Sequence, residues 1–206
     1  MGLYNDVFLP RAIDKVCSAG TIMKMRSRVV PRARGQVLEI GMGSGLNLSL
    51  YDPARVDKVY GLDPVPAMRA ASQARRDQAP FEVQWLDASA ESIPLPDASI
   101  DSVVLTYTLC TIPDPQRALA EMRRVLRPDG ELLFCEHGLA PDGFTGGLQR
   151  AIDPVWHRLA GGCHLDRKMS ELLEGAGFEL EDLQEQYARK VVRFLGYTST
   201  GIARAR

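Results

Sequence analysis

Three glycines at alternate positions follow an acidic residue in the segment VLEIGMGSGLN, which runs from Val37 to Asn47. A glycine-rich turn between a strand and a helix lets the backbone approach a ligand closely and presents free N–H groups where the helix begins. The spacing differs from the dinucleotide-binding pattern G-x-G-x-x-G, because Leu46 stands where the third glycine is required. A P-loop is excluded, since no lysine followed by Ser or Thr is present in the turn. We therefore expect the turn to hold a nucleotide-like cofactor of another kind.

A second acidic residue, Asp63, ends the next hydrophobic run, in the segment VYGLDP. Nucleotide-binding α/β folds place a carboxylate about 20 residues after the glycine turn, where it accepts hydrogen bonds from ribose hydroxyls. One carboxylate and two neighbouring hydroxyls make a bidentate match. Alone, Asp63 also fits an ordinary turn after a strand, but together with Glu39 and the glycines it favours a ribose site.

Histidine and cysteine residues are the candidate reactive groups. His137 follows the fifth hydrophobic run, at the edge where open α/β sheets present their ligand crevice, and is the best-placed general base; a hydrogen-bonded structural histidine is the alternative. The segment GGCHLDR places Cys163 beside His164, but adjacent side chains need not converge, and no ligand pair has the spacing of a zinc site. Cys135 and His137 would share one face of a strand, which makes a metal site conceivable, yet we expect no metal.

Composition limits the remaining classes of protein. A chain of 206 residues that is 45% hydrophobic can build one sizeable core, so we expect a single domain. The net charge of −1, with mixed acids and bases, argues against nucleic acid as a partner. The sequence shows neither a basic-then-apolar leader nor an integral membrane segment, which predicts a cytoplasmic protein with reduced cysteines. Neither Ser44 nor Ser199 lies in a G-x-S-x-G motif, so a hydrolase of that type is excluded.

Strand-like and helix-like runs alternate along the chain, which indicates an α/β fold with a mostly parallel sheet covered on both faces. The expected strands are QVLEIG, KVYGLD, FEVQWLD, DSVVLTY and GELLFCEHG. Helices are expected over residues 66–78 and 115–126 and in DRKMSELLEGAGF, where Asp166 would be the N-cap. Two further runs, FELEDLQEQ and VVRFLGYTSTGIARA, should complete the sheet as an antiparallel hairpin at one edge.

Four segments together resemble the successive signature motifs of class I S-adenosylmethionine-dependent methyltransferases: VLEIGMGSGLN, VYGLDP, ASAESIPLPDASIDSVV and ALAEMRRVLRPDGELLFCEH. The resemblance covers about residues 36–138. It implies a Rossmann-like seven-stranded sheet of order 3-2-1-4-5-7-6 with helices on both faces. It also implies a single domain over 1–206, with a cofactor-binding core over 36–138 and acceptor-side helices and the edge hairpin over 139–206.

The same resemblance assigns residues to S-adenosylmethionine. Gly41, Gly43 and Gly45 would pass beneath its methionine part, and Glu39 would support the turn or bind the amino group through water. Asp63 would hold the ribose. The other implied cofactor contacts are Asn47, Pro64 or Val65 beside the adenine, Ser89 and Ala90 at the adenine edge, and Thr106 and Leu109 behind the sulfonium. Many relatives carry Asp where Ser89 stands, so Asp87 or Glu91 is an alternative contact there.

A narrower resemblance extends into the last third of the chain. The segments LTYTLCTIPDP, FCEHGLAPDG and LQRAIDPVWHRLAGGCHLDRK are similar to a subgroup associated with small-thiol S-methylation, which has also carried annotations for lipid amines. A small hydrophobic thiol is therefore the favoured acceptor; an amine or phospholipid headgroup, or a phenol, is the alternative. The implied acceptor-pocket residues are Cys110, Trp156, His157, Cys163 and His164, with simple packing as the competing role. Eukaryotic members have a hydrophobic N-terminal membrane segment that this sequence lacks, so membrane association is not inferred.

The first 30 residues have apolar positions compatible with short amphipathic helices. In this superfamily such a segment often covers the cofactor, so we expect a helical lid over 1–30 in which Tyr4 and Phe8 close the site; packing on the sheet edge is the alternative. Two other functions stay open: a cofactor-binding protein without catalysis, and a nicotinamide oxidoreductase, which Leu46 disfavours. Whether the protein is a monomer or a homodimer is left open.

Overall fold

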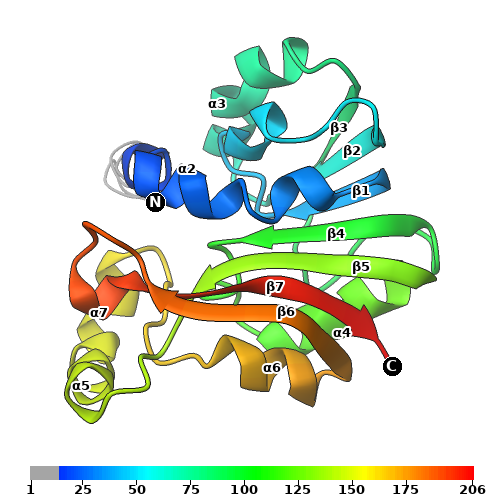
Figure 1. The fold of residues 1–206 in the computed structure, drawn as a ribbon. Helices are drawn as coiled ribbons and strands as arrows, with labels where there is room; N and C mark the ends of the chain where they lie inside the picture. The colour runs from blue at the N-terminus through cyan, green and yellow to red at the C-terminus, as the bar shows by residue number, and fades with distance from the viewer. Residues whose placement is uncertain (1–13) are drawn as a thin grey trace.

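A computed structural model describes residues 14–206, and it contains one seven-stranded sheet of order β3-β2-β1-β4-β5-β7-β6 (Figure 1). The order and the α/β class confirm the sequence-based expectation. The strands are β1 (Gly35–Ile40), β2 (Val56–Leu62), β3 (Glu82–Leu86), β4 (Ile100–Thr106), β5 (Leu126–His137), β6 (Phe178–Tyr187) and β7 (Tyr197–Ala205).

The first five strands pair in parallel, with β1 between β2 and β4. Their carboxyl ends therefore meet at one edge, which is where parallel sheets place ligand crevices. The antiparallel hairpin of β6 and β7 is confirmed, and β7 also pairs antiparallel with β5. The expected start of the last strand is wrong, because Arg193–Gly196 form the short helix α7 and β7 begins at Tyr197. The backbone N–H of Ala188 donates to the Gly196 carbonyl at 2.7 Å and so connects the end of α7 to the segment after β6.

Helices cover both faces of the sheet because successive strand residues alternate between two cores. Leu38 and Phe134 pack with α4 and α6, whereas Val37 and Val104 pack with α2 on the opposite face. The helices are α2 (Gly20–Arg26), η2 (Val30–Arg32), η3 (Leu46–Ser49), α3 (Pro66–Asp77), α4 (Pro115–Val125), α5 (Gly143–Leu159), α6 (Met169–Gly175) and α7.

The expected helices over 66–78 and 115–126 are confirmed to within one residue at their ends. The side chain of Asp114 caps α4 by accepting from the Arg117 N–H at 3.0 Å. Asp166 is not the cap of the later helix, because α6 begins at Met169 after Lys168. The Arg167 carbonyl instead accepts a hydrogen bond from the Leu139 N–H at 2.9 Å, which ties the residues before α6 to the loop after β5.

Helix α5 has an unusual polarity. Its buried residues include the polar Thr145, Gln149 and Asp153. Its outer face carries exposed apolar side chains, with Phe144 84% and Val155 61% exposed. The Gln149 amide shows what the buried polar face does, because it donates to the Gly138 and Phe194 carbonyls at 3.0 and 2.9 Å and accepts from the Ala140 N–H at 2.8 Å. Helix α5 therefore positions neighbouring loops by hydrogen bonds.

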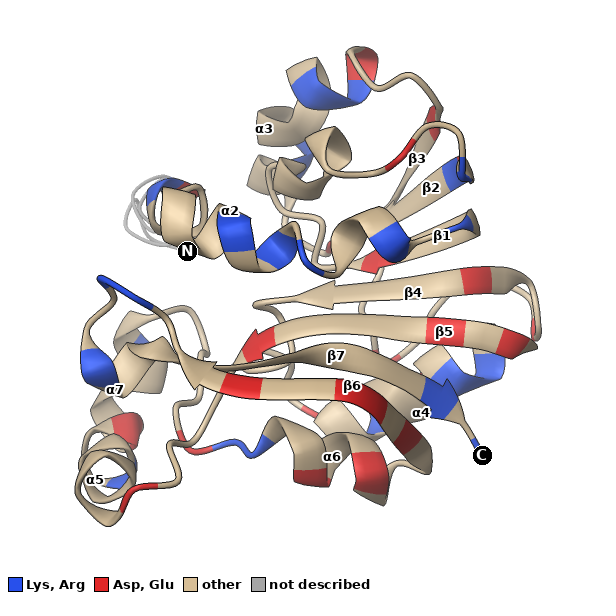
Figure 2. Ribbon diagram, in the orientation of Figure 1, with Lys and Arg blue, Asp and Glu red and all other residues tan. Residues whose placement is uncertain are grey.

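None of the helices within residues 14–206 has the length and hydropathy that a membrane span requires. Figure 2 shows both signs of charge spread over the elements, with basic residues on α2 and near α7 and acidic residues on β6 and α6.

Candidate functional site

The glycine turn follows β1 at the carboxyl edge of the sheet. Gly41, Gly43 and Gly45 have φ values of 64°, 57° and 80°, a left-handed conformation that favours glycine. A Cβ on Gly41 would lie 2.4 Å from the Thr108 side chain, so this glycine permits close packing. Among residues 14–206, a Cβ on Gly43 would meet only the Gly41 carbonyl oxygen, at 3.9 Å. The described residues thus leave space beside Gly43 that a ligand can occupy.

Asp63 lies beside this turn, directly after β2, and is only 7% exposed. Its two carboxylate oxygens accept from the backbone N–H groups of Gly43 and Val65, both at 2.9 Å. Burial raises the pKa of Asp63, and the two N–H donors oppose that shift. A carboxylate oxygen can accept two hydrogen bonds, so each keeps the capacity to accept another donor, such as a hydroxyl. Pro64 and Val65 continue the chain from this anchor.

Glu39 supports the turn from below. Its carboxylate is fully buried and accepts from the Asn47 side-chain amide at 3.0 Å and from the Tyr51 hydroxyl at 2.8 Å. Burial raises the pKa of Glu39 to about 7, against those two hydrogen bonds. Asn47 belongs to the same hydrogen-bond network, because its side-chain amide also donates to the Thr106 hydroxyl at 3.0 Å.

Arg26 is a site residue that the sequence reasoning missed. From α2, its guanidinium donates to the side-chain amide oxygen of Asn47 at 2.9 Å and to the Thr106 hydroxyl at 2.6 Å, and it lies 5.2 Å from the centre of the Tyr107 ring. The side chain is 6% exposed. No signal in GTIMKMRSR distinguishes this arginine from its neighbouring basic residues.

The residues expected at the adenine edge follow β3, which joins the same edge through the hydrogen bond from the Asp63 N–H to the Leu86 carbonyl at 3.2 Å. Ser89 donates its hydroxyl proton to Glu91 at 2.6 Å, and Ala90 is buried. Asp87 pairs with Arg69 at 2.6 Å. Asp87, Ser89 and Glu91 are thus each engaged with a protein partner.

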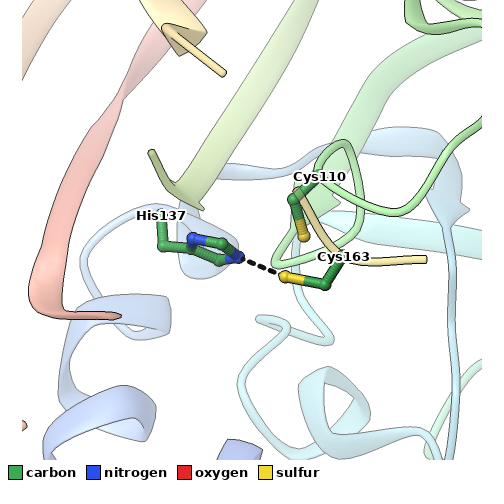
Figure 3. Close-up of side chains that lie close together, drawn as sticks. All are labelled: Cys110, His137 and Cys163. Atoms are coloured by element: carbon green, nitrogen blue, oxygen red, sulfur yellow. Dashed lines mark hydrogen bonds between the residues drawn. The ribbon is translucent and has the colours of Figure 1, made fainter. Parts of the chain in front are cut away.

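Three residues from distant segments form what we call the thiol–imidazole cluster: Cys110, His137 and Cys163 (Figure 3). They come from the loop after β4, the end of β5 and the loop after α5. The Cys163 sulfur lies 3.2 Å from His137 Nε2. All three potential ligand atoms lie within 4.8 Å of one another.

The pKa values of the two thiols in the cluster are shifted in opposite directions. Hydrogen bonding from Cys110, reinforced by His137, lowers the pKa of Cys163, whereas the pKa of Cys110 is raised by its contact with Cys163 and by burial. Burial lowers the pKa of His137, but the hydrogen bond and charge of Cys163 outweigh it, so the net shift is upward. Cys163 is therefore the more acidic thiol of the pair.

Backbone and side-chain hydrogen bonds fix the loops that carry the cluster. The His164 N–H donates to the Cys110 carbonyl at 2.9 Å, which ties the two cysteine loops together. Arg167 donates to the carbonyls of Leu109 and Ile112. From α5, Asp153 accepts from the Leu165 N–H at 2.6 Å and contacts His164 Nδ1 at 2.9 Å. Asp153 and Arg167 are positioning residues that the sequence reasoning missed.

Glu136, also missed, is buried directly before His137. One of its oxygens accepts from the N–H groups of Thr108 and Leu109 at 2.7 and 3.2 Å, and burial raises its pKa to about 7. An acid inside the apolar run LLFCEHG was the available signal. The Tyr107 ring stacks on the His137 imidazole, with 6.5 Å between ring centres.

Other expected acceptor residues surround the cluster. Trp156 packs edge-on against Phe194, with 5.8 Å between ring centres, and His157 stacks on His164 at 5.2 Å. Cys135 does not join His137: its side chain is buried in the core on the α2 face, so that pairing is wrong as a candidate metal site. Tyr4 and Phe8 lie outside the described residues.

The residues at the glycine turn fit the cofactor that the motifs imply. Gly43 offers open space beside the backbone, and Asp63 offers free acceptor capacity at its border. Among residues 14–206, four buried side-chain atoms have no hydrogen-bond partner: Arg26 Nε, Glu136 Oε2, His137 Nδ1 and Trp156 Nε1. Such atoms are uncommon in folded proteins and mark places where a ligand can complete the bonding.

Comparison with known proteins agrees with this geometry. The family described as a methyltransferase domain matches residues 38–134. "Thiol S-methyltransferase TMT1B" of Homo sapiens is 32% identical over 186 residues, which are 87% of this chain and 75% of the human protein. The chain belongs to the class I S-adenosylmethionine-dependent methyltransferase family.

Two further comparisons place this methyltransferase among its relatives. The TMT1B protein of Rattus norvegicus is 36% identical over 155 residues, which are 73% of this chain and 62% of the rat protein, less than two thirds of that protein's length. The structure of 1,6-didemethyltoxoflavin-N1-methyltransferase from Burkholderia thailandensis, with bound 1,6-didemethyltoxoflavin and S-adenosylhomocysteine, superposes with a TM-score of 0.69. It covers 99% of this chain and 84% of its own, at 19% identity, and so supports the fold.

Proposed function

We propose that this methyltransferase methylates the sulfur of a small hydrophobic thiol. S-adenosylmethionine, when bound, supplies an electrophilic methyl group on a sulfonium sulfur. The glycine turn and Asp63 would hold this cofactor, with Ser89 and Ala90 beside its adenine. The remaining tasks of the protein are to align the acceptor, exclude water and remove a proton.

The arrangement of His137 is the observation that carries the proposal. Its Nε2 is held on the Cys163 sulfur at 3.2 Å, while its Nδ1 is buried and has no partner among residues 14–206. With the Nε2 proton donated to the Cys163 thiolate, Nδ1 presents a lone pair that can take the acceptor's S–H proton. The resulting imidazolium is stabilised by the neighbouring Cys163 and Glu136, and stacking on Tyr107 fixes the plane of the ring.

The surroundings of His137 favour sulfur over nitrogen in the acceptor. On the proposed acceptor side, the cluster contributes the Cys110 and Cys163 sulfur atoms, and Trp156 contributes an aromatic ring beside Cys163. A thiol has a pKa near 8.5 and needs only modest help to become a nucleophile. An amine is protonated at neutral pH and needs a stronger means of losing its proton. The similarity to thiol S-methyltransferases supports the same choice.

Matched acceptors test the proposal. Alkyl thiols, amines and phenols of similar size would be incubated with S-adenosylmethionine, and the methylated products identified by mass spectrometry. We expect thioether formation to exceed N- and O-methylation by about 100-fold or more. His137→Gln should lower kcat for the thiol by about 10²–10⁴-fold, as expected for loss of a general base.

The affinity of His137→Gln for S-adenosylhomocysteine is the control, because the glycine turn does not contact His137 and that affinity should stay within about twofold. Faster turnover of an amine or a phospholipid headgroup than of any thiol would contradict the thiol assignment. A folded protein that binds the cofactor product but turns over no acceptor would favour a binding protein without catalysis.

We also propose that the N-terminal segment closes the cofactor site as a lid. The Asp14 carboxylate accepts from the Ser44 hydroxyl in the glycine turn, and Arg26 reaches Asn47 in η3 and Thr106 at the end of β4. Deletion of residues 1–20 should weaken S-adenosylhomocysteine binding by about tenfold or more. Unchanged affinity in a folded truncated protein would contradict the lid.

A further inference from the structure

We propose that the thiol–imidazole cluster is a zinc-binding site, with Cys110, His137 and Cys163 as ligands and a fourth position open. Two thiolates and one imidazole are donors that zinc accepts and that magnesium and calcium do not prefer. The inference that this site binds metal is independent of the acceptor identity proposed above.

The geometry of the cluster suits tetrahedral coordination. With Zn–S of about 2.3 Å and Zn–N of about 2.0 Å, a tetrahedral site separates its ligand atoms by about 3.5–3.8 Å. The three ligand atoms already lie within 4.8 Å of one another, and Cys163 Sγ is 3.2 Å from His137 Nε2. Figure 3 shows the three side chains converging, with the Cys163 sulfur directed at the imidazole. Small side-chain adjustments therefore complete the site.

The cluster is also rigidly supported. The hydrogen bond from the His164 N–H to the Cys110 carbonyl joins the two ligand loops, and Arg167 and Asp153 hold each loop from outside. Preorganised ligands reduce the ordering cost of binding a metal. Cys163 is half-buried, which leaves a path for the ion to enter.

The net charge of the metal complex favours zinc binding in this buried position. On binding, any proton that the Cys110 or Cys163 thiol still carries is released to solvent, so that two thiolates, a neutral imidazole and Zn²⁺ form a complex of zero net charge. A neutral complex costs less to bury than either a free thiolate or a free cation. The spacing rules applied to the sequence did not reveal the site, because its ligands come from three segments that only the fold brings together.

A neighbouring group offers a different donor set. Asp153, His164 and Asp166 also lie close enough to ligate an ion, but they supply two carboxylates and no sulfur. Both Asp153 oxygens are already engaged with the Leu165 N–H and His164. The donor set therefore distinguishes the two groups spectroscopically.

Cobalt(II) titration of the purified full chain tests the proposal, because Co²⁺ replaces Zn²⁺ in tetrahedral sites and reports thiolate ligands by a sulfur-to-cobalt charge-transfer band. We expect the band to saturate at one Co²⁺ per chain and to be displaced by Zn²⁺. Cys163→Ser and Cys110→Ser should each weaken Co²⁺ binding by about tenfold or more and reduce the band.

Cys135→Ser is the matched control, since Cys135 is a buried thiol on the same strand as His137 but outside the cluster. Its band should equal that of the wild type. Binding of S-adenosylhomocysteine by each variant verifies that it is folded. Absence of a thiolate band in the wild type, or an undiminished band in folded Cys163→Ser, would overturn the proposal.

One consequence rests on the proposed function. A zinc ion on His137 Nε2 leaves Nδ1 protonated, so Nδ1 can no longer take the proton of the acceptor thiol. Zinc-loaded protein should therefore lose thiol methylation while retaining S-adenosylhomocysteine binding. A chelator should restore turnover. If no acceptor is ever methylated, the cobalt spectrum still decides whether the cluster binds metal, so the two proposals fail separately.

Discussion

Two regions lie at the same edge of the sheet: the glycine-turn region, which is residues 39–47 with Asp63, and the thiol–imidazole cluster. They differ in how completely their buried polar groups are hydrogen-bonded. In the glycine-turn region, the carboxylates of Glu39 and Asp63 each accept two hydrogen bonds. Around the cluster, His137, Glu136 and Trp156 each keep a buried atom without a partner among residues 14–206. The protein itself thus fixes the carboxylates of the first region, whereas the second region keeps buried polar atoms that the described residues leave unpaired.

Among the substitutions that test this comparison, Asp63→Ala has the largest expected effect, which is on the affinity for S-adenosylhomocysteine. The change removes the proposed ribose anchor and leaves the Gly43 and Val65 N–H groups without an acceptor. Hydrogen bonds to a charged group contribute about 1.5–3 kcal/mol each, so the affinity for S-adenosylhomocysteine should fall by about 100-fold or more in calorimetric titration.

Asp77→Ala is a suitable control for that experiment, because Asp77 is an exposed acid at the end of α3 whose carboxylate accepts from Gln73. It should leave the affinity unchanged. Equal affinities in folded Asp63→Ala and wild type would show that the glycine-turn region does not anchor the cofactor through this carboxylate.

Glu39→Gln tests whether the scaffold holds a buried charge. The pKa of Glu39 is raised from 4.5 to about 7, so the folded state binds more protons than the unfolded state between these values. In the wild type, this group's contribution to stability is therefore fully present below pH 4.5 and is lost as the pH rises to about 7. At 1.36 kcal/mol per pKa unit the loss amounts to about 3 kcal/mol.

The amide that Glu39→Gln introduces cannot ionise, and it can donate to the Tyr51 hydroxyl in place of accepting from it. The stability of Glu39→Gln relative to wild type should thus increase by about 3 kcal/mol between pH 4.5 and pH 8, measured by urea unfolding. A difference that does not change with pH would mean that Glu39 titrates normally in the folded protein.

The smallest expected effects are those of alanine substitutions at two glycines of the same turn, Gly41 and Gly43. Gly41→Ala would bring a Cβ to 2.4 Å from Thr108 and should lower the free energy of unfolding by about 1–3 kcal/mol. Gly43→Ala meets no such contact, so its cost is the left-handed backbone, about 1 kcal/mol. If the open space is the cofactor's, Gly43→Ala should nevertheless weaken S-adenosylhomocysteine binding more than its stability cost explains; calorimetry and urea unfolding of both variants provide the measurements.

The same contrast explains what the sequence could predict. The glycine turn and Asp63 could be located from local spacing and a connected series of motifs, and the strand order that the family resemblance implied is confirmed. Helix boundaries near 166–169 and 193–196 depend on contacts with distant backbone, and there the local signals failed.

The candidate site divides in the same way. His137 was expected from its position after a strand, but its partners Cys110 and Cys163 are 27 and 26 residues away, and no periodicity links them. Arg26 and Asp153 were missed because a buried ion in a helix looks like an exposed one until its hydrogen-bond partners are known. The roles of the individual cofactor and acceptor residues stay predictions.

Helices α4 and α5 differ in what they bury, and this has a consequence for local stability. α4 buries Leu119, Met122 and Val125, whereas α5 buries Thr145, Gln149 and Asp153. Apolar burial is the main favourable term in folding, so α5 gains less from it and should open at a lower free energy than α4. Its amide hydrogens should then exchange with solvent while those of the sheet remain protected. Since Asp153 on α5 holds the Cys163 loop, each such opening would expose the thiol–imidazole cluster without disturbing the glycine-turn region.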